Sequence, residues 1–118
     1  GIPWNDDKFP PSAEARVARV VRTIDGDPSV PLTLGRLARR AGLSPYHFLR
    51  VFERVTGITP HQYVRRARLR EAGMRLVAEP GNVLDLALDS GFGDVSNFNR
   101  AFRAEFGMSP IAFRRTPR

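Results

Sequence analysis

The feature that most constrains the fold of this 118-residue chain is a short pattern that occurs twice. The stretch FLRVFERVTGITP (48–60) returns fifty residues later as FNRAFRAEFGMSP (98–110), with Phe, Arg, Phe, Gly and Pro at the same offsets. Two aromatic residues four apart, followed by Gly and Pro, are typical of an amphipathic helix that ends and a second helix that begins. The chain is therefore predicted to contain two copies of one helical unit.

Each copy also includes the residues before its aromatic helix. LGRLARRAG (34–42) matches VLDLALDSG (83–91) at an offset of 49, and a short turn, LS or FGD, follows each. Ser44 and Asp94 then stand where an N-cap belongs, because their side chains can accept from the first free N–H groups of a helix. The pattern of helix, tight turn and helix is the helix-turn-helix signature.

The sequence predicts an all-α fold of about seven helices, with two helix-turn-helix subdomains joined by a long linker helix. Helices are expected at 12–25, 34–41, 45–56, 60–78, 83–91, 95–106 and 110–115. The expected divisions are a flexible leader or linker remnant at 1–11, a first subdomain at 12–59, a connecting helix at 60–79 and a second subdomain at 80–118. The expected core residues are Val17, Val20, Val21, Ile24, Leu34, Leu37, Ala38, Ala41, Phe48, Val51, Phe52, Val55, Leu69, Ala72, Leu76, Phe98, Phe102 and Phe106.

The positive charge is concentrated in one part of the chain. The net charge is +7, and residues 36–75 carry ten arginines against only Glu53 and Glu71. A local field of that sign suits a polyanion such as nucleic acid, or an anionic membrane surface. The plain alternative is an arginine-rich composition that only produces a solvated face.

Several classes of function are disfavoured by composition. The chain has no Cys, its only histidines are His47 and His61, and it contains no Gly-rich phosphate loop. Neither a catalytic triad nor a metal cluster can be assembled, so we expect no enzyme, cofactor or metal site. No apolar run approaches the roughly 20 residues of a membrane span, so we expect no membrane partner and a cytoplasmic location. Besides DNA binding, a helical protein-interaction module or an RNA-binding module remains open.

The two copies resemble a known family. LARRAGLSPYHFLRVFERVTGITPHQYVRRARLREAGMRL, followed by DLALDSGFGDVSNFNRAFRAEFGMSPIAFRR, strongly resembles the DNA-binding domain of AraC/XylS-type transcription regulators. The resemblance covers about 12–115, and its most specific part is A-x-x-x-G-F-x-D-x-S-x-F-x-R-x-F-x-x-x-F-G-x-S-P-x-x-F-R at 87–114. It implies a transcription activator or repressor that inserts two recognition helices into successive major grooves of double-stranded promoter DNA.

The resemblance also implies which side chains contact bases. They are Tyr46, Leu49 and Arg50 in the first recognition helix and Ser96, Asn97, Asn99 and Arg100 in the second. Arg can bond guanine and Asn can bond adenine through two hydrogen bonds each, whereas Leu49 can contact only an apolar edge such as a thymine methyl group. Three alternatives stay open: Asn97 supports the Asp94 cap, the two arginines contact phosphates or nearby carboxylates instead of bases, or Tyr46 packs over the turn.

A larger set is expected at the phosphate backbone, although some of its arginines are expected only to face water. Its members are Arg39, Arg40, Arg54, Thr59, His61, Arg65, Arg66, Arg68, Arg103 and Ser109. Family members commonly carry an N-terminal effector-binding or dimerisation domain, and the leader at 1–11 cannot supply one. The expected partners are therefore promoter DNA, RNA polymerase and a domain of that kind.

Overall fold

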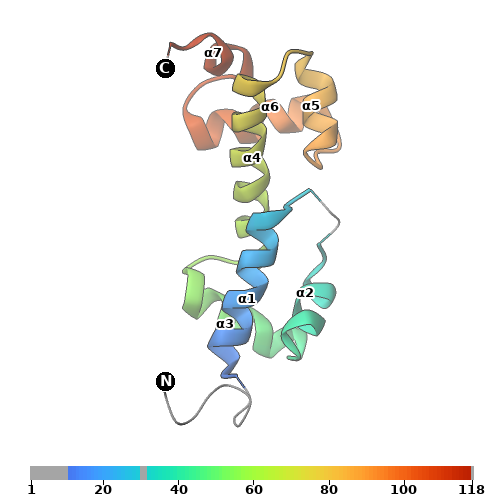
Figure 1. Cartoon of the computed structure of the whole chain (residues 1–118), viewed down its shortest axis with the longest axis vertical. Coiled ribbons are helices and arrows are strands. Elements are labelled where there is room, and N and C mark those ends of the chain that lie inside the picture. Colours follow the sequence, from blue (N-terminus) through green and yellow to red (C-terminus); the bar gives the residue numbers. More distant parts are fainter. Residues whose placement is uncertain (1–10, 30–31, 118) are drawn as a thin grey trace, which may run out of the picture. The chain divides into compact units, whose positions relative to one another are not determined.

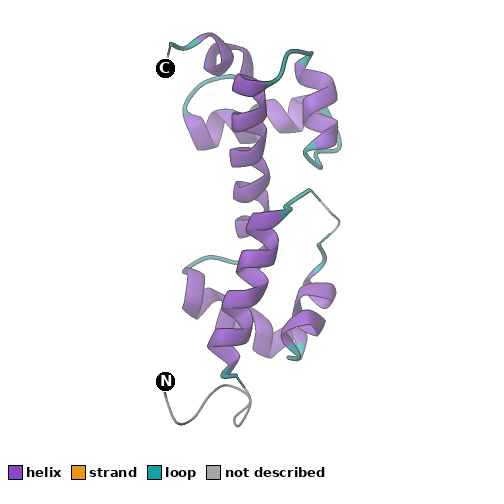
Figure 2. Ribbon diagram, viewed as in Figure 1, coloured by secondary structure: helices purple, strands orange, loops and turns teal. Residues whose placement is uncertain are grey.

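The computed structural model describes residues 11–29 and 32–117, so most of the expected leader at 1–11 lies outside the described residues. Within them every regular element is a helix and there is no strand (Figure 1, Figure 2). The helices are α1 (Ala13–Gly26), α2 (Leu34–Ala41), α3 (Pro45–Thr56), α4 (Pro60–Ala78), α5 (Val83–Asp89), α6 (Val95–Phe106) and α7 (Pro110–Arg115). The predicted all-α fold of seven helices is confirmed.

The helices begin where local capping chemistry allows. The hydroxyl of Ser44 accepts from the N–H of His47 at 3.2 Å, and a carboxylate oxygen of Asp94 accepts from the N–H of Asn97 at 2.7 Å. Pro45 fills the first position of α3, where a missing N–H costs no hydrogen bond. These caps fix the start of the second helix in each helix-turn-helix pair.

The described chain forms two compact units. The first comprises 11–26 and 32–62, and the second comprises 27–29 and 63–117. Nearly all of α4 therefore belongs with the second unit. Each unit contains one helix-turn-helix pair, α2 with α3 or α5 with α6, and one supporting helix, α1 or α4.

In the first unit, α1, α2 and α3 pack against one another around a small core (Figure 1). The rings of Phe48 and Phe52 lie 5.5 Å apart, centroid to centroid, and both are fully buried. Two of the expected core residues are wrong: Leu34 and Val55 are each 40% exposed. Both lie at a helix end, Leu34 at the start of α2 and Val55 near the end of α3, where fewer neighbouring side chains can cover them.

The second unit has a more aromatic core. The rings of Phe98 and Phe102 lie 5.6 Å apart, and Phe106 and Phe113 pack against the same cluster. Its other buried members come from α4, α5, the turn before α6 and α6 itself: Leu69, Ala72, Leu76, Leu86, Ala87, Phe92 and Ala101. Phe106, expected in the core, is partly buried at its edge.

The duplication extends to the supporting helices. Three buried positions of α1 correspond to three buried positions of α4 at an offset of 52: Val17 with Leu69, Val20 with Ala72 and Ile24 with Leu76. The repeated unit is therefore three helices, because the same stripe supports the helix-turn-helix pair in both copies.

An arginine of the supporting helix lies against the turn glycine in each unit. In the first unit, Nη1 of Arg16 donates to the carbonyls of Ala41 and Gly42, at 3.1 and 3.3 Å. In the second, Arg68 packs so closely on Gly91 that a Cβ there would lie 3.1 Å from Nε. Arg16 and Arg68 are also paired by the offset of 52, so the arginine contact at the turn is part of the duplication.

The supporting helix also carries an ion pair to its recognition helix, with the charges reversed between the units. Glu14 of α1 accepts from Arg54 of α3 at 3.0 Å. Arg66 of α4 lies 3.7 Å from Glu105 of α6. Glu14 and Arg66 occupy corresponding positions at the offset of 52, whereas Arg54 corresponds to Ala104 at the offset of 50, so the two ion pairs share only their position on the supporting helix.

Candidate nucleic-acid interface

The outer face of α3 presents the first group of expected base-contacting residues. Tyr46 and Arg50 lie one turn apart on the side opposite Phe48 and Phe52, and Leu49 lies on the flank of the helix beside them. Tyr46 is 70% exposed and Arg50 is exposed, whereas Leu49 is half-buried. The face therefore offers one aromatic hydroxyl and one guanidinium, with the aliphatic side chain of Leu49 beside them.

Tyr46 and Arg50 are joined to each other. Nη1 of Arg50 donates to the phenolic oxygen of Tyr46 at 2.9 Å. The guanidinium carbon lies 5.7 Å from the centre of the Tyr46 ring, within cation–π range. Tyr46 is thus held by its helix neighbour and does not fold over the turn.

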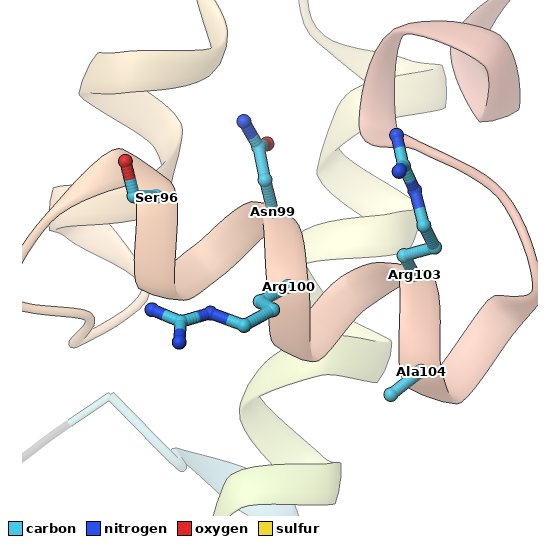
Figure 3. A pocket seen from close by; sticks show the side chains of 5 residues that line it. All are labelled: Ser96, Asn99, Arg100, Arg103 and Ala104. Atoms are coloured by element: carbon cyan, nitrogen blue, oxygen red, sulfur yellow. The ribbon is translucent and has the colours of Figure 1, made fainter.

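The outer face of α6 presents the second group around a shallow hollow of about 550 Å³. Its walls come from Ser96, Asn99, Arg100, Arg103 and Ala104. Figure 3 shows Ser96, Asn99 and Arg103 projecting from the same side of the helix, whereas Arg100 extends in a different direction. One hydroxyl, one amide and two guanidinium groups therefore share one open surface.

Asn97 lies at the edge of this surface. Its side chain is half-buried and does not line the hollow, and its backbone N–H is bound by the Asp94 carboxylate at 2.7 Å. The cap uses the Asn97 main chain, so its side-chain amide stays available, but from a less exposed position than Asn99.

The two hydroxyl residues expected at phosphates serve as helix caps. Thr59 accepts from the N–H of Gln62 at 3.2 Å, and the Gln62 amide oxygen accepts from the N–H of Thr59 at 3.1 Å. Ser109 accepts from the N–H of Ala112 at 3.1 Å. A hydroxyl that accepts a bond in the cap keeps its own hydrogen to donate, so capping and phosphate binding are compatible.

Three of the arginines expected at phosphates are engaged within the chain. Arg54 and Arg66 pair with Glu14 and Glu105 as described above. Nε of Arg68 donates to the carbonyl of Pro28 at 2.7 Å, and its side chain is half-buried. These contacts leave Arg68 the least accessible of the three to a phosphate.

The remaining side chains of this set are exposed. Within the described part of the chain, no hydrogen bond or ion pair engages the side chains of Arg39, Arg40, His61, Arg65 and Arg103. Arg39 and Arg40 lie in the last turn of α2, where a positive charge also favours the helix dipole. The first unit and the start of α4 therefore carry most of the unengaged positive charge.

Local electrostatics reflect the ion pairs. The pKa of Glu14 is lowered, first by a hydrogen bond from its own backbone N–H and then by the Arg54 guanidinium. The pKa of Arg75 is raised, first by its hydrogen bond to Glu79 and then by that to Asp89. Arg75 thus bridges the end of α4 to α5 and stays charged.

Arg16 is the residue of this region that inspection of the sequence misses. It is not among the residues expected to contact DNA, but its hydrogen bonds to the carbonyls of Ala41 and Gly42 stabilise the turn before α3. Its only signal in the sequence is its correspondence with Arg68 at an offset of 52, which differs from the 49 and 50 that relate the other helices.

Two features are absent from the described residues. In that part of the chain no three His, Cys, Asp or Glu side chains gather as metal ligands. Nor does any helix there combine the length and apolar character that crossing a membrane requires.

Comparison with known proteins identifies the family. A helix-turn-helix domain family matches residues 37–116. The Right origin-binding protein of Escherichia coli (strain K12) is 38% identical over 96 residues, which are 80% of this chain and 32% of that protein. The chain thus spans about a third of the length of that relative.

Solved structures give the same result. The DNA-binding domain of AdpA, a global transcriptional factor solved in complex with a target DNA, superposes with a TM-score of 0.78 and 29% identity. The match covers 84% of this chain and 89% of that one. A probable AraC family transcriptional regulator from Rhodopseudomonas palustris CGA009 matches with a TM-score of 0.76 and 30% identity, over 83% and 93% of the chains. The chain belongs to the AraC/XylS-type family of helix-turn-helix proteins.

Proposed function

We propose that this chain binds double-stranded DNA in a sequence-specific manner and regulates transcription. The observation that carries the proposal is the pair of outward faces on α3 and α6, which share one scaffold and carry different hydrogen-bonding side chains. An α-helix fits the major groove, where each base pair presents its own pattern of donors and acceptors. The likeness to a domain solved with its target DNA supports the same role.

The proposed mechanism uses both recognition helices. Tyr46 and Arg50 contact one half-site, and Ser96, Asn99 and Arg100 contact the other, in successive major grooves about 34 to 36 Å apart along one face of the duplex. The two faces share only the arginine, so the half-sites are expected to differ in sequence. The unengaged arginines of α2 and α4, with the hydroxyls of Thr59 and Ser109, fix the register on the phosphates.

Competition between nucleic acids at several salt concentrations tests the proposal. The chain is titrated with a duplex recovered from a random pool, a scrambled duplex and a single-stranded RNA of equal length. The recovered duplex should bind more tightly than the scrambled one by a factor of about 10³ or more, with an affinity that falls as salt rises. Equal affinity for all three would reject sequence-specific DNA binding, and preference for the RNA would favour an RNA-binding module.

RNA polymerase is proposed as a protein partner, and the outer face of α5 supports this. At positions where α2 carries Gly35, Arg36, Arg39 and Arg40, α5 carries Leu84, Asp85, Leu88 and Asp89. The two leucines are 48% and 49% exposed. Aspartates repel phosphates, so this face suits a partner surface with apolar and basic side chains better than it suits DNA.

A gel-shift assay separates polymerase recruitment from DNA binding. An Asp85→Ala, Leu88→Ala variant should bind the recovered duplex with unchanged affinity and recruit less polymerase to a promoter that contains it. The control is Arg39→Ala, Arg40→Ala on the outer face of α2, which should weaken DNA binding itself. Unchanged polymerase recruitment by the α5 variant would reject this partner surface.

The proposal also covers the wider setting of the chain. It assigns a binding role without catalysis, in the cytoplasm, together with an effector-binding or dimerisation domain. The family and the limited share of the Escherichia coli relative that the chain spans support such a domain.

A further inference from the structure

Tyr46 and Arg50 form a connected pair on the surface of α3. The hydrogen bond of 2.9 Å and the ring contact at 5.7 Å join residues one helical turn apart. Since Tyr46 is 70% exposed, the pair is not a consequence of core packing. It is presented to solvent as a single polar group.

We propose, on the basis of the DNA-binding function proposed above, that Tyr46 and Arg50 recognise two neighbouring base pairs as one unit. In this unit Tyr46 positions the Arg50 guanidinium to donate to the O6 and N7 edge of a guanine. Tyr46 also donates its own hydroxyl hydrogen to an acceptor on the adjacent base pair. Tyr46 is thus both a positioning and a specificity-determining residue.

The hydrogen-bond inventory of the pair determines what it can bind. The Tyr46 oxygen accepts from Arg50, so its hydroxyl hydrogen is left to donate, and accepting from a cation strengthens that donor. The guanidinium keeps other N–H groups for O6 and N7 of guanine. The pair therefore presents a row of donors. A guanine beside a guanine or thymine oxygen matches this row, whereas the amino group of cytosine opposes it.

Holding the arginine before binding also favours affinity. An Arg side chain loses much rotamer freedom when it is fixed at an interface. The contact with Tyr46 restricts the guanidinium while the protein is free, so less freedom is lost on binding. The hydroxyl of Tyr46 should therefore contribute to the contact made by Arg50 as well as to its own.

The second unit provides a natural control. Ser96 and Arg100 stand at the positions of Tyr46 and Arg50, at an offset of 50. Within the described residues no hydrogen bond joins their side chains, and Figure 3 shows them extending in different directions. Arg100 is thus an arginine at the same place on the same scaffold without a positioning partner.

Two double-mutant cycles on the recovered duplex test the proposal. The first combines Tyr46→Phe with Arg50→Ala, and the second combines Ser96→Ala with Arg100→Ala. Tyr46→Phe keeps the ring and removes only the hydroxyl. The loss of affinity that it causes should be about two- to tenfold greater when Arg50 is present than when Arg50 is Ala, because the hydroxyl then supports the Arg50 contact in addition to making its own. Ser96→Ala should have the same effect with or without Arg100.

Base preference gives a second readout. Duplexes that vary each base under α3 should show that Tyr46→Phe loses discrimination against cytosine at the pair beside the guanine. Additive losses in the first cycle, or unchanged base preference in Tyr46→Phe, would overturn the inference while leaving DNA binding intact. If the unsubstituted chain selects no duplex at all, the proposed function fails and the inference fails with it. Unfolding curves of each variant show whether it is folded, so that a loss of DNA binding is not mistaken for a loss of folding.

Discussion

At the residue scale, an arginine lies against each of the two turns, through hydrogen bonds in the first unit and through close packing in the second. An arginine from the supporting helix reaches the turn that precedes each recognition helix, Arg16 at Gly42 and Arg68 at Gly91. The turn sets the direction in which the following helix leaves. These arginines therefore act on the recognition face without belonging to it.

Replacing Arg16 should destabilise the first unit. Arg16→Ala removes the donor to Ala41 and Gly42 and should lower the free energy of unfolding by about 1 to 3 kcal/mol. Urea denaturation followed by circular dichroism measures the loss. The control is Arg19→Ala on the same helix, which is exposed and should cost less than about 0.5 kcal/mol. Equal, small losses from both variants would show that Arg16 does not hold the turn.

At the scale of the elements, the two glycines that end α2 and α3 differ in their surroundings. Gly42 and Gly57 both have positive φ, 67° and 82°, where a side chain is strained. A Cβ at Gly42 would lie 3.1 Å from Nη1 of Arg16, whereas nothing lies within 4 Å of one at Gly57.

Alanine at these two positions should therefore have unequal costs. Gly57→Ala should lower the free energy of unfolding by the backbone strain alone, about 1 to 2 kcal/mol. Gly42→Ala should cost about 1 kcal/mol more, because it also displaces the Arg16 bonds. The same denaturation experiment compares them. A Gly42→Ala variant no less stable than Gly57→Ala would mean that Arg16 adapts freely.

The elements also show how much can be predicted from sequence. Most helix ends are predicted because they have a local signal, such as Ser44 before Pro45 or Gly57 after the last turn of α3, whereas α5 ends at Asp89, two residues before its expected end. The exposure of Leu34 and Val55 is not predicted from the sequence, because burial at a helix end depends on which neighbouring side chains reach it. The match of α1 to α4 was missed, since only Ala15 with Ala67 and Arg16 with Arg68 are identical at that offset.

The candidate site is also only partly predictable from the sequence. The family resemblance implies which residues share the outer faces of α3 and α6, and the structure brings Ser96, Asn99 and Arg100 together on α6. Spacing does not predict contacts between distant segments, so the engagement of Arg68 by Pro28 has no sequence signal. The Tyr46–Arg50 bond was also unforeseen, because four-residue spacing permits such a contact without requiring it.

At the scale of the whole molecule, charge is distributed unequally along the duplicated chain. Residues 36–75 hold ten arginines and two glutamates, whereas 76–118 hold five acidic and five basic residues. The contribution of phosphate contacts to the binding free energy should therefore come mainly from α2, α3 and α4. The near-neutral second helix-turn-helix pair should contribute mainly to sequence selectivity.

This charge distribution predicts unequal losses from matched arginines. Arg50→Ala should weaken binding to the recovered duplex more than Arg100→Ala does. Arg65→Ala should reduce the slope of log affinity against log salt by about one counterion, whereas Arg115→Ala on α7 should leave it unchanged. Fluorescence anisotropy at several salt concentrations measures both effects. Equal losses for Arg50 and Arg100, with an unchanged slope for Arg65→Ala, would contradict this division of roles.

The two similar scaffolds are expected to recognise two different half-sites, and selection of duplexes from a random pool tests this expectation. The expected result is a bipartite site whose halves differ in sequence and whose centres lie about one helical turn, 10 to 10.5 base pairs, apart. In that selection, Arg50→Ala should relax one half and Arg100→Ala the other. A single enriched half-site, two identical halves, or no enrichment would show that the two scaffolds do not recognise two different half-sites.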